Sequence, residues 1–459
     1  MLLTLLSLFA CNHAADDTTV PAVTTVPWSG ELPELRAEVS DVRGFHAARA
    51  LIHMHSPFSH DACDGAGYVD GVVDQDCLAD LRHGLCASRV DVSFFTDHPA
   101  FASEQEWAAL FHPQPGDEAV VVGPDQLASR IQCEDGHKVL WMPGIEDELM
   151  PVALDHHVAD SAAENDRLYN GTDLEAIQAE QAAGGFVLQA HTEGKSLELL
   201  LQRQQWGLSG VEIFNLHAMF DPNRREQDLG LDRLGWITDI APFTNPNATG
   251  EPDLFFLGVH GIQQVSIDRW NALLQNGPMV ATAGTDGHQN VLLVTLRDGD
   301  RGDSYRRVMR WFANTLLVDD DTPQAYEAAL RAGRSYITYH LLGVPTGFDF
   351  HAMATDGTVL EMGSSAEPGV TISLTCPTLS EHSPRGEEVP VIEGSVWKDG
   401  VLWQSGCGEW LATEPGAYQA RVDITPHHLK PFLGEDPAPY LRPFPWVQSN
   451  AIRLGLPTP

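Results

Sequence analysis

Histidine and carboxylate side chains, which are common ligands of zinc, manganese and iron, recur where short apolar segments of this chain end. The segments are IHMHSPFSHD with His53, His55, His60 and Asp61; SFFTDH with Asp97 and His98; MPGIE with Glu146; DHH with His156 and His157; VLQAH with His191; and AGTDGH with Asp286 and His288. One histidine at a strand end is usually a hydrogen-bonded structural residue. This many together indicate one shared metal site.

The spacing of these residues agrees with strands that point into a common opening. Alternate side chains of an extended strand share a face at a separation of about 6–7 Å, so His53 and His55 point the same way. The carboxyl ends of parallel strands gather at one mouth of a β/α architecture. We therefore expect the ligand-type side chains to converge at such a mouth.

The elements that must position these residues follow the pattern of repeated β/α units. Apolar, β-branched runs alternate with helical stretches through the middle of the chain. A capping box of Thr172 and Glu175 predicts a helix that ends near residue 183, just before the strand FVLQAH. Further helices are expected at residues 196–206, from an N-cap at Ser266 to residue 276, and from Thr322 to Gly333.

The pattern changes near residues 343–349 to short alternating runs such as VTISL and YQARVDI, separated by Pro and Gly. Such runs predict a β-sandwich. The expected fold class is therefore α/β, a barrel followed by a smaller β-rich domain. The expected segments are a signal segment at residues 1–11, a flexible tether at 12–40, the barrel at 41–343 and the C-terminal domain at 344–459.

The first eleven residues, MLLTLLSLFAC, are apolar but shorter than the ~20 residues that span a bilayer, and they indicate an export signal. Their end, LFAC, resembles a bacterial lipobox, in which the Cys thiol is lipidated. We expect an exported protein held in the bacterial cell envelope by a lipid on Cys11. An ordinary signal peptide is the alternative.

The charge balance limits the partners. The 459 residues include 27 Lys plus Arg against 64 Asp plus Glu, a formal net charge of −37. Such an acidic surface repels nucleic acid phosphates and anionic lipid headgroups. We therefore expect a small-molecule substrate and no nucleic acid, while the sequence indicates no particular protein partner.

Six cysteines remain besides Cys11, and export favours disulfides among them. They form an early group of Cys63, Cys77, Cys86 and Cys133 and a late pair of Cys376 and Cys407, without a C-x-x-C motif. If each group pairs internally, three connectivities remain, with Cys376 bonded to Cys407; buried free thiols are the alternative. The acidic segment between Cys63 and Cys77 is expected to be a disulfide-tied lid rather than a calcium loop.

These residues resemble the PHP (polymerase and histidinol phosphatase) superfamily of metal-dependent hydrolases. The matching motifs are H-x-H-S-x-x-S from His53, T-D-H ending at His98, G-x-E ending at Glu146, A-H at His191, G-V-E-I-F-N from Gly210 and G-T-D-G-H from Gly284. The helix EAALRAGRSYIT and the C-terminal addition resemble, more loosely, the exported carbaryl-hydrolase-like (CehA/McbA) branch. The resemblance implies a distorted seven-stranded (β/α) barrel that holds two or three divalent ions.

The resemblance also implies which residues hold the ions. One ion would lie on His53, His55, Glu146 and Asp286. Glu146 would bridge to a second ion held by His157 and His191, with His156 competing for the place of His157. A third would lie on His98, His288 and either His60 or Asp61, a choice that the sequence leaves open.

This mixture of imidazole and carboxylate suits zinc, manganese or iron. Adjacent ions ~3.5–4 Å apart lower the pKa of a shared water towards neutrality, so no Ser or Cys nucleophile is needed. Asp97 is expected to orient a ligand imidazole or to shuttle a proton, and Lys195 to neutralise an oxyanion. Arg224, Arg225 and His217 are weaker candidates at the same mouth.

The predicted function is that of a metal-dependent hydrolase, and a phosphoester is the favoured substrate class. A carboxylic or carbamate ester at the same metal site is the first alternative, because the negative envelope does not attract phosphates. A surface module with purely structural metals is the second alternative. The full ligand set, with Glu146 opposite Asp286, argues against this second alternative.

Overall fold

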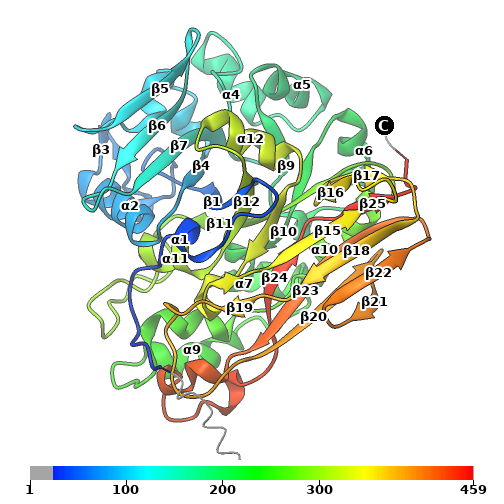
Figure 1. Ribbon diagram of the computed structural model, residues 1–459. Coiled ribbons are helices and arrows are strands. Elements are labelled where there is room, and N and C mark those ends of the chain that lie inside the picture. The colour runs from blue at the N-terminus through cyan, green and yellow to red at the C-terminus, as the bar shows by residue number, and fades with distance from the viewer. Residues whose placement is uncertain (1–23, 458–459) are drawn as a thin grey trace, which may run out of the picture.

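Seven strands close into a barrel in the computed structural model, which describes residues 24–457 (Figure 1). Around the ring they are β1 (His46–Met54), β4 (Val92–Asp97), β7 (Lys138–Ile145), β8 (Leu149–Val152), β9 (Phe186–Gln189), β10 (Gly210–Asn215) and β11 (Val280–Gly287). The ring closes because β11 pairs with β1. The α/β class is confirmed in this coarse form.

The direction of β8 departs from the regular (β/α)7 ring that the resemblance implies. β8 runs antiparallel to both β7 and β9, whereas the other neighbours in the ring run parallel. Residues 146–148 join β7 to β8 as a short hairpin, which leaves no room for a helix. The barrel is therefore a mixed one.

Helices cover the outside of the barrel, so its strands are buried on both faces. Every residue of β1, β4 and β10 is buried. The covering helices are α2 (Gln75–Ala87), α4 (Ala162–Tyr169), α5 (Leu174–Ala182), α6 (Leu197–Trp206), α10 (Gln264–Leu274), α11 (Tyr305–Trp311) and α12 (Pro323–Arg331).

Both predicted helix caps are wrong, whereas the two helices expected to start at Ser196 and Thr322 do start there. The side chains of Ser196 and Thr322 cap α6 and α12. α5 is capped by Asp173, whose carboxylate accepts the Ala176 N–H, and not by Thr172. A carboxylate at this position also favours the positive end of the helix dipole. Ser266 lies inside α10, which begins at Gln264.

The sheet continues from the barrel into the C-terminal region. β12 (Ala313–Val318) pairs antiparallel with the first half of β1, and β13 (Ser335–Thr338) pairs with β12. β13 then pairs with β24 (Phe444–Ser449), and β24 with β23 (Gly416–Thr425). Main-chain hydrogen bonds thus run across the predicted boundary near residues 343–349.

The C-terminal region also contains a second, four-stranded antiparallel sheet. Its strands are, in order, β16 (Val359–Glu361), β15 (Asp349–Met353), β18 (Val370–Thr375) and β22 (Gly408–Ala412). Phe350 and Ile372 of this sheet share one hydrophobic cluster with Val396 and Val422 of the large sheet. Figure 1 shows these yellow and orange strands side by side on the right of the molecule.

Residues 24–40 lie against the body of the protein, which corrects the expected tether for this part of the chain. Leu32 and Leu35 are 5% and 2% exposed, and the Trp28 indole donates to Asp253 at 3.0 Å. Asp253 is also paired with three arginines of α11, here called the arginine cluster: Arg306, Arg307 and Arg310. The signal segment, Cys11 and the first part of the tether lie outside the described residues.

Three disulfides pair the cysteines within the two expected groups. The bonds are Cys63–Cys77, Cys86–Cys133 and Cys376–Cys407. The first ties down residues 63–77, as expected of the acidic segment. Among residues 24–457, no helix combines the length and the apolar character needed to cross a bilayer.

Candidate metal centre

The carboxyl ends of the barrel strands bring most of the predicted ligands together. They come from the end of β1 (His53, His55), the residues just after β4 (His98), β7 (Glu146) and β9 (His191), and the end of β11 (Asp286, His288). The backbone φ is 63° at His53, 50° at His191 and 46° at Asp286. This left-handed region costs a residue other than glycine about 1–2 kcal/mol. The chain is therefore bent where these side chains must converge.

Asp286 lies between three imidazoles at the centre of the cluster. Its Oδ1 is 3.4 Å from His53 Nε2 and 3.5 Å from His55 Nε2, and its Oδ2 is 3.5 Å from His191 Nε2. Glu146 Oε1 lies 3.9 Å from His53 Nε2 and 3.6 Å from His191 Nε2. These separations exceed hydrogen bonds. They suit atoms that share one ion at ~2.0–2.2 Å.

The far side of each central imidazole is fixed by a second partner. His53 Nδ1 is 2.6 Å from Glu212 Oε1, and His55 Nδ1 is 2.9 Å from Ser59 Oγ. The Nε2 atoms of both rings are buried without a hydrogen-bond partner. Buried nitrogen atoms normally have a partner, and metal-bound histidines are held in this way through their other nitrogen. The donor set therefore fits a divalent ion.

His98, His288 and Asp61 form an adjoining group. Asp61 Oδ2 is 3.3 Å from His288 Nε2 and 3.8 Å from His98 Nε2. His98 Nδ1 lies 2.9 Å from Glu146 Oε2, which connects this group to the centre. His60 is exposed and groups with Asp61 and His98 only. Of the two residues that the sequence left open, Asp61 lies beside both imidazoles, whereas His60 is grouped with His98 and not with His288.

Three further residues join the site from β10 and the helix after it. Glu212, which the sequence analysis did not single out, holds His53 and accepts the His191 N–H at 2.9 Å. Asn215 donates to Asp286 at 3.3 Å. His217 Nδ1, from α7 (Leu216–Phe220), is 3.5 Å from Asp286 Oδ2. The sequence feature that could have predicted a role for Glu212 is its position in the motif GVEIFN, where a carboxylate stands between apolar residues of a buried strand.

Gly284 makes room for this arrangement. A Cβ atom at this position would lie 1.8 Å from Glu212 Oε1 and 3.0 Å from His53 Nδ1. Any larger residue would therefore push apart the pair of Glu212 and His53. This explains why a glycine stands inside an otherwise apolar strand.

His157 is not brought to the cluster, which corrects its expected role as a ligand. Its Nε2 bonds the Gln105 carbonyl at 2.9 Å and its Nδ1 the Tyr169 hydroxyl at 3.2 Å. Burial lowers its pKa, as for a neutral structural histidine. His156 is exposed and joins no ligand group among residues 24–457.

The predicted cations of the mouth are engaged elsewhere. Lys195 Nζ pairs with Glu148 at 3.0 Å, and Arg224 pairs with Asp228 at 3.0 Å. Arg225 donates to the Met219 carbonyl at 2.6 Å. Each of these side chains is therefore held by a protein partner.

Asp97 is buried directly behind the cluster. Its carboxylate accepts the Ser56 backbone N–H and the Ser56 hydroxyl, both at 2.6 Å. Burial raises the pKa of Asp97 to about 6, against these hydrogen bonds, which lower it. Asp97 thus fixes the turn after His55 and makes no contact with the ligand atoms of the other strands.

Charge in the cluster is strongly coupled. Burial opposes a charge on His53, yet Glu212 and Asp286 raise its pKa to about 10. Burial likewise opposes a charge on His98, and Glu146 raises its pKa to about 9. Burial favours a neutral Asp286, but the surrounding imidazoles hold its pKa well below its usual range. The carboxylates therefore require positive charge close by, which protons or a bound cation can supply.

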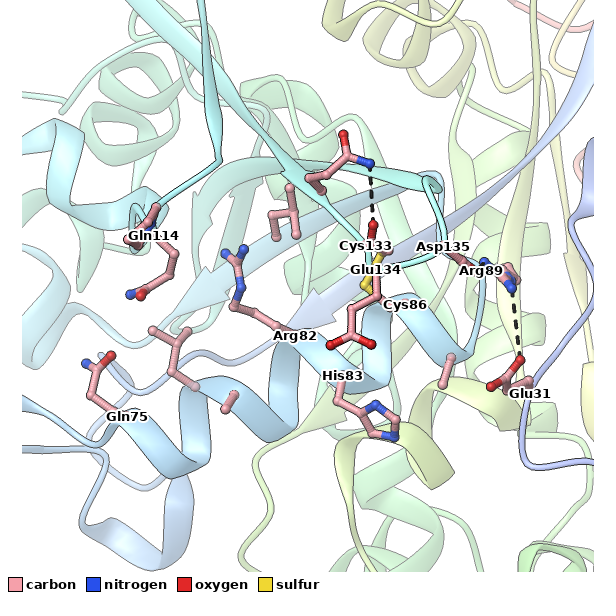
Figure 2. A pocket seen from close by; sticks show the side chains of 16 residues that line it. Glu31, Gln75, Arg82, His83, Cys86, Arg89, Gln114, Cys133, Glu134 and Asp135 are labelled. Atoms are coloured by element: carbon pink, nitrogen blue, oxygen red, sulfur yellow. Dashed lines mark hydrogen bonds and ion pairs between the residues drawn. A yellow bond between two sulfur atoms is a disulfide. The ribbon is translucent and has the colours of Figure 1, made fainter.

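A wide cavity of about 590 Å³ lies elsewhere, along α2 and the turn after β6 (Asp125–Gln132). Figure 2 shows Arg82, His83 and Glu134 around the Cys86–Cys133 disulfide that lines it. Arg82 is paired with Asp117. The grouped ligand atoms of the described residues lie at the barrel mouth and none in this cavity, so we place the candidate site at the mouth.

No protein-family model matches the chain, and no curated protein does. Among solved structures, one is a two-domain protein containing a predicted PHP-like metal-dependent phosphoesterase from Bacteroides vulgatus ATCC 8482. It matches with a TM-score of 0.34 and 13% identity over 88% of this chain and 96% of its own. PsfC from Pseudomonas syringae PB-5123 matches with a TM-score of 0.32 and 13% identity over 62% and 89%. Because these likenesses are weak, we infer the chemistry from this chain's own side chains.

Proposed function

We propose that this chain is a metal-dependent hydrolase with two or three divalent ions, zinc, manganese or iron, at the barrel mouth. The observation that carries the proposal is the set of buried Nε2 atoms of His53, His55 and His288, which have no hydrogen-bond partner and lie beside carboxylates. A buried polar atom without a partner costs about 1–3 kcal/mol. A cation among them would satisfy several such atoms at once.

The ligand atoms form overlapping groups, among which we propose three neighbouring places for ions. We assign one ion to His53, His55, Glu146 and Asp286. We assign a second to Glu146, Asp286 and His191, with His217 in the place that His157 was expected to take. We assign a third to His98, His288 and Asp61.

Bound divalent ions supply Lewis acidity and a more acidic water. In the hydrolysis, the water oxygen would bond to the phosphorus or carbon atom of the ester, the bond from that atom to the leaving oxygen would break, and a proton of the water would pass to the leaving oxygen to give the alcohol. Glu212 and Ser59 hold the imidazoles of His53 and His55 in place through their Nδ1 atoms. Asp97 is a positioning residue that holds the turn at Ser56.

Two ester classes remain as candidates. A phosphoester comes first, because a centre of adjacent ions can hold both the attacking and the leaving oxygen. A carboxylic or carbamate ester comes second. It is favoured because Lys195 is paired with Glu148 and Arg224 with Asp228, so neither cation is free to bind an anionic phosphate.

The test is a metal analysis and a substrate screen on the purified full chain. We expect bound divalent metal and hydrolysis of at least one of three chromogenic classes: phosphomonoesters, phosphodiesters or carboxyl esters. His53→Ala and Asp286→Asn should abolish both properties, while His83→Ala, an exposed histidine of α2, should leave both unchanged. Hydrolysis that survives both cluster variants would contradict the proposal. Tightly bound metal without turnover of any substrate class would favour the alternative of a surface module with purely structural metals.

We further propose that the protein is exported and anchored to the bacterial cell envelope by a lipid on Cys11, and acts on a small molecule rather than a nucleic acid. The three disulfides support export, because they persist in oxidising compartments. Detergent phase partition tests the anchor. The full-length product should enter the detergent phase and Cys11→Ser should remain in the aqueous phase; recovery of both in the aqueous phase would contradict acylation.

A further inference from the structure

An apolar pocket opens beside the candidate metal centre. Its polar end is formed by His217, Asp286 and His288, whose ligand atoms lie within 4.8 Å of one another. Most of the remaining wall is apolar, and its apolar side chains, here called the apolar pocket, are Leu216, Phe220, Phe255, Phe256, Val291, Leu292 and Val308; Gly287, Gln289 and Asp303 complete the lining. A group bound in this pocket would therefore lie next to the bond that the ions act on.

The inner wall of the apolar pocket is a packed set of aromatic rings. The ring centroids of Phe255 and Phe256 are 4.1 Å apart, and Phe256 stacks on Trp311 at 4.3 Å. Phe220 meets Phe256 at 6.0 Å. These separations are typical of well-packed aromatic pairs, so the wall presents a fixed apolar surface.

The outer lip is a segment with exposed apolar side chains. Val291, Leu293 and Val294 are 51%, 65% and 53% exposed, while Leu292 turns into the pocket. Asp303 holds the lip, because its Oδ2 accepts the backbone N–H groups of Val291 at 2.6 Å and Leu292 at 2.8 Å. Exposed apolar residues beside a pocket often mark a ligand site.

The enclosed space is about 30 Å³, close to the share of one water molecule in the liquid. A larger group enters only when the lip shifts outward. Such a shift would have to strain or break the hydrogen bonds from Val291 and Leu292 to Asp303. On the solvent side, the exposed side chains of Val291, Leu293 and Val294 meet no packed neighbour among the described residues. Ligand binding would then cover apolar surface that is now in contact with water, which is favourable.

No lysine or arginine lines the apolar pocket within the part of the chain that the structure describes. The nearest cations of the mouth are held by other groups: Lys195 by Glu148, Arg224 by Asp228 and Arg269 by the Thr192 carbonyl. An anionic group would find no counter-ion there and would lose its hydration, and the Asp303 carboxylate that a cation could use already pairs with Arg301 and accepts two backbone N–H groups. The pocket therefore suits an uncharged apolar group.

We infer that the apolar pocket binds an uncharged aromatic or branched alkyl group of the ester substrate, beside the bond that is hydrolysed. This inference rests on the proposed function, since it assigns the substrate class of the same site. It predicts that the enzyme prefers esters with one bulky apolar substituent over their methyl counterparts.

The test compares phenyl 4-nitrophenyl phosphate with methyl 4-nitrophenyl phosphate, which share charge and leaving group. If the screen finds a carboxyl esterase, 4-nitrophenyl benzoate and 4-nitrophenyl acetate replace them. Leu292→Ala should lower kcat/KM about tenfold for the phenyl substrate and less than twofold for the methyl one, because a buried leucine contact is lost. The matched control Leu293→Ala, whose side chain points to solvent and is not part of the pocket, should change neither. An equal effect of Leu292→Ala on both substrates would overturn the inference.

A binding measurement separates the pocket from the proposed activity. Calorimetry of the metal-loaded full chain should show phenylphosphonate binding at least tenfold more tightly than methylphosphonate, with the difference lost in Leu292→Ala. That result without turnover of any ester would keep the pocket and reject the hydrolase. Equal affinities for the two phosphonates together with ester turnover would reject the pocket and keep the hydrolase. Binding of neither phosphonate together with turnover of no ester would reject both.

Discussion

Glu212→Gln tests whether the side chain behind a ligand controls the metal centre. The Glu212 carboxylate accepts from His53 Nδ1 at 2.6 Å, from the His191 N–H at 2.9 Å and from Asn215 Nδ2 at 3.2 Å. A glutamine has the same shape but only one acceptor oxygen. Its NH₂ group would therefore face either His53 Nδ1 or the His191 N–H, and that donor would lose its acceptor. One buried hydrogen bond to a charged group is thereby lost, at a cost of about 1.5–3 kcal/mol.

This cost corresponds to a loss in zinc affinity of roughly 10- to 100-fold. The assay is a zinc titration of the stripped full chain against a competing chromogenic chelator. Glu180→Gln is the matched control: Glu180 is also fully buried, but burial raises its pKa well above the usual range, and it belongs to no ligand group among the described residues. It should bind zinc like the wild type. Affinities for Glu212→Gln and wild type within a factor of two would refute the reasoning.

Three further changes have defined outcomes. Burial of the carboxyl group acts to raise the pKa of Asp253, but the arginine cluster lowers this pKa from 3.8 to about 2. The ionised Asp253 therefore contributes its full share of the folding stability above pH ~4, and this share is lost as the pH falls towards 2. Urea unfolding should show Asp253→Asn about 2 kcal/mol less stable at pH 7, without this acid-dependent loss; parallel pH profiles would contradict the assignment. His157→Ala should keep wild-type metal content by elemental analysis, and loss of metal would restore His157 as a ligand. Cys63→Ser with Cys77→Ser opens a loop with a sequence separation of 14 and should cost about 3 kcal/mol in guanidinium unfolding; an unchanged midpoint would assign the anchoring of this segment to the Asp64–Arg301 ion pair.

The residues that the sequence predicted well are those that stand where an apolar strand ends. His53, His55, Asp286 and His288 meet because the carboxyl ends of β1 and β11 lie side by side. The simple alternation of side chains does not hold there, since the register shifts between Ile52 and Met54 and φ is positive at His53 and Asp286. His157 was predicted poorly, since it lies in the irregular stretch after β8, where no period fixes the direction of a side chain. Its two hydrogen-bond partners come from segments that its local sequence does not reveal.

The missed features depend on contacts between distant parts of the chain. Glu212 resembles any acidic residue in a strand until His53, 159 positions away, is seen beside it. The reversed direction of β8 was hidden because a run such as LMPV fits a strand of either direction. The wrong cap at Thr172 reflects a close competition between neighbouring polar residues, which Asp173 wins by its charge.

The pairing of β13 with β24 decides how the molecule can be divided. A chain cut after Gly343 would keep β13 but lose the strand that covers its edge, and bare edges recruit other chains. An isolated barrel of this kind should therefore precipitate or associate where the intact protein stays dispersed. A cut at this point would pass through a backbone hydrogen-bond ladder that both parts share, so experiments on this protein should use the whole polypeptide.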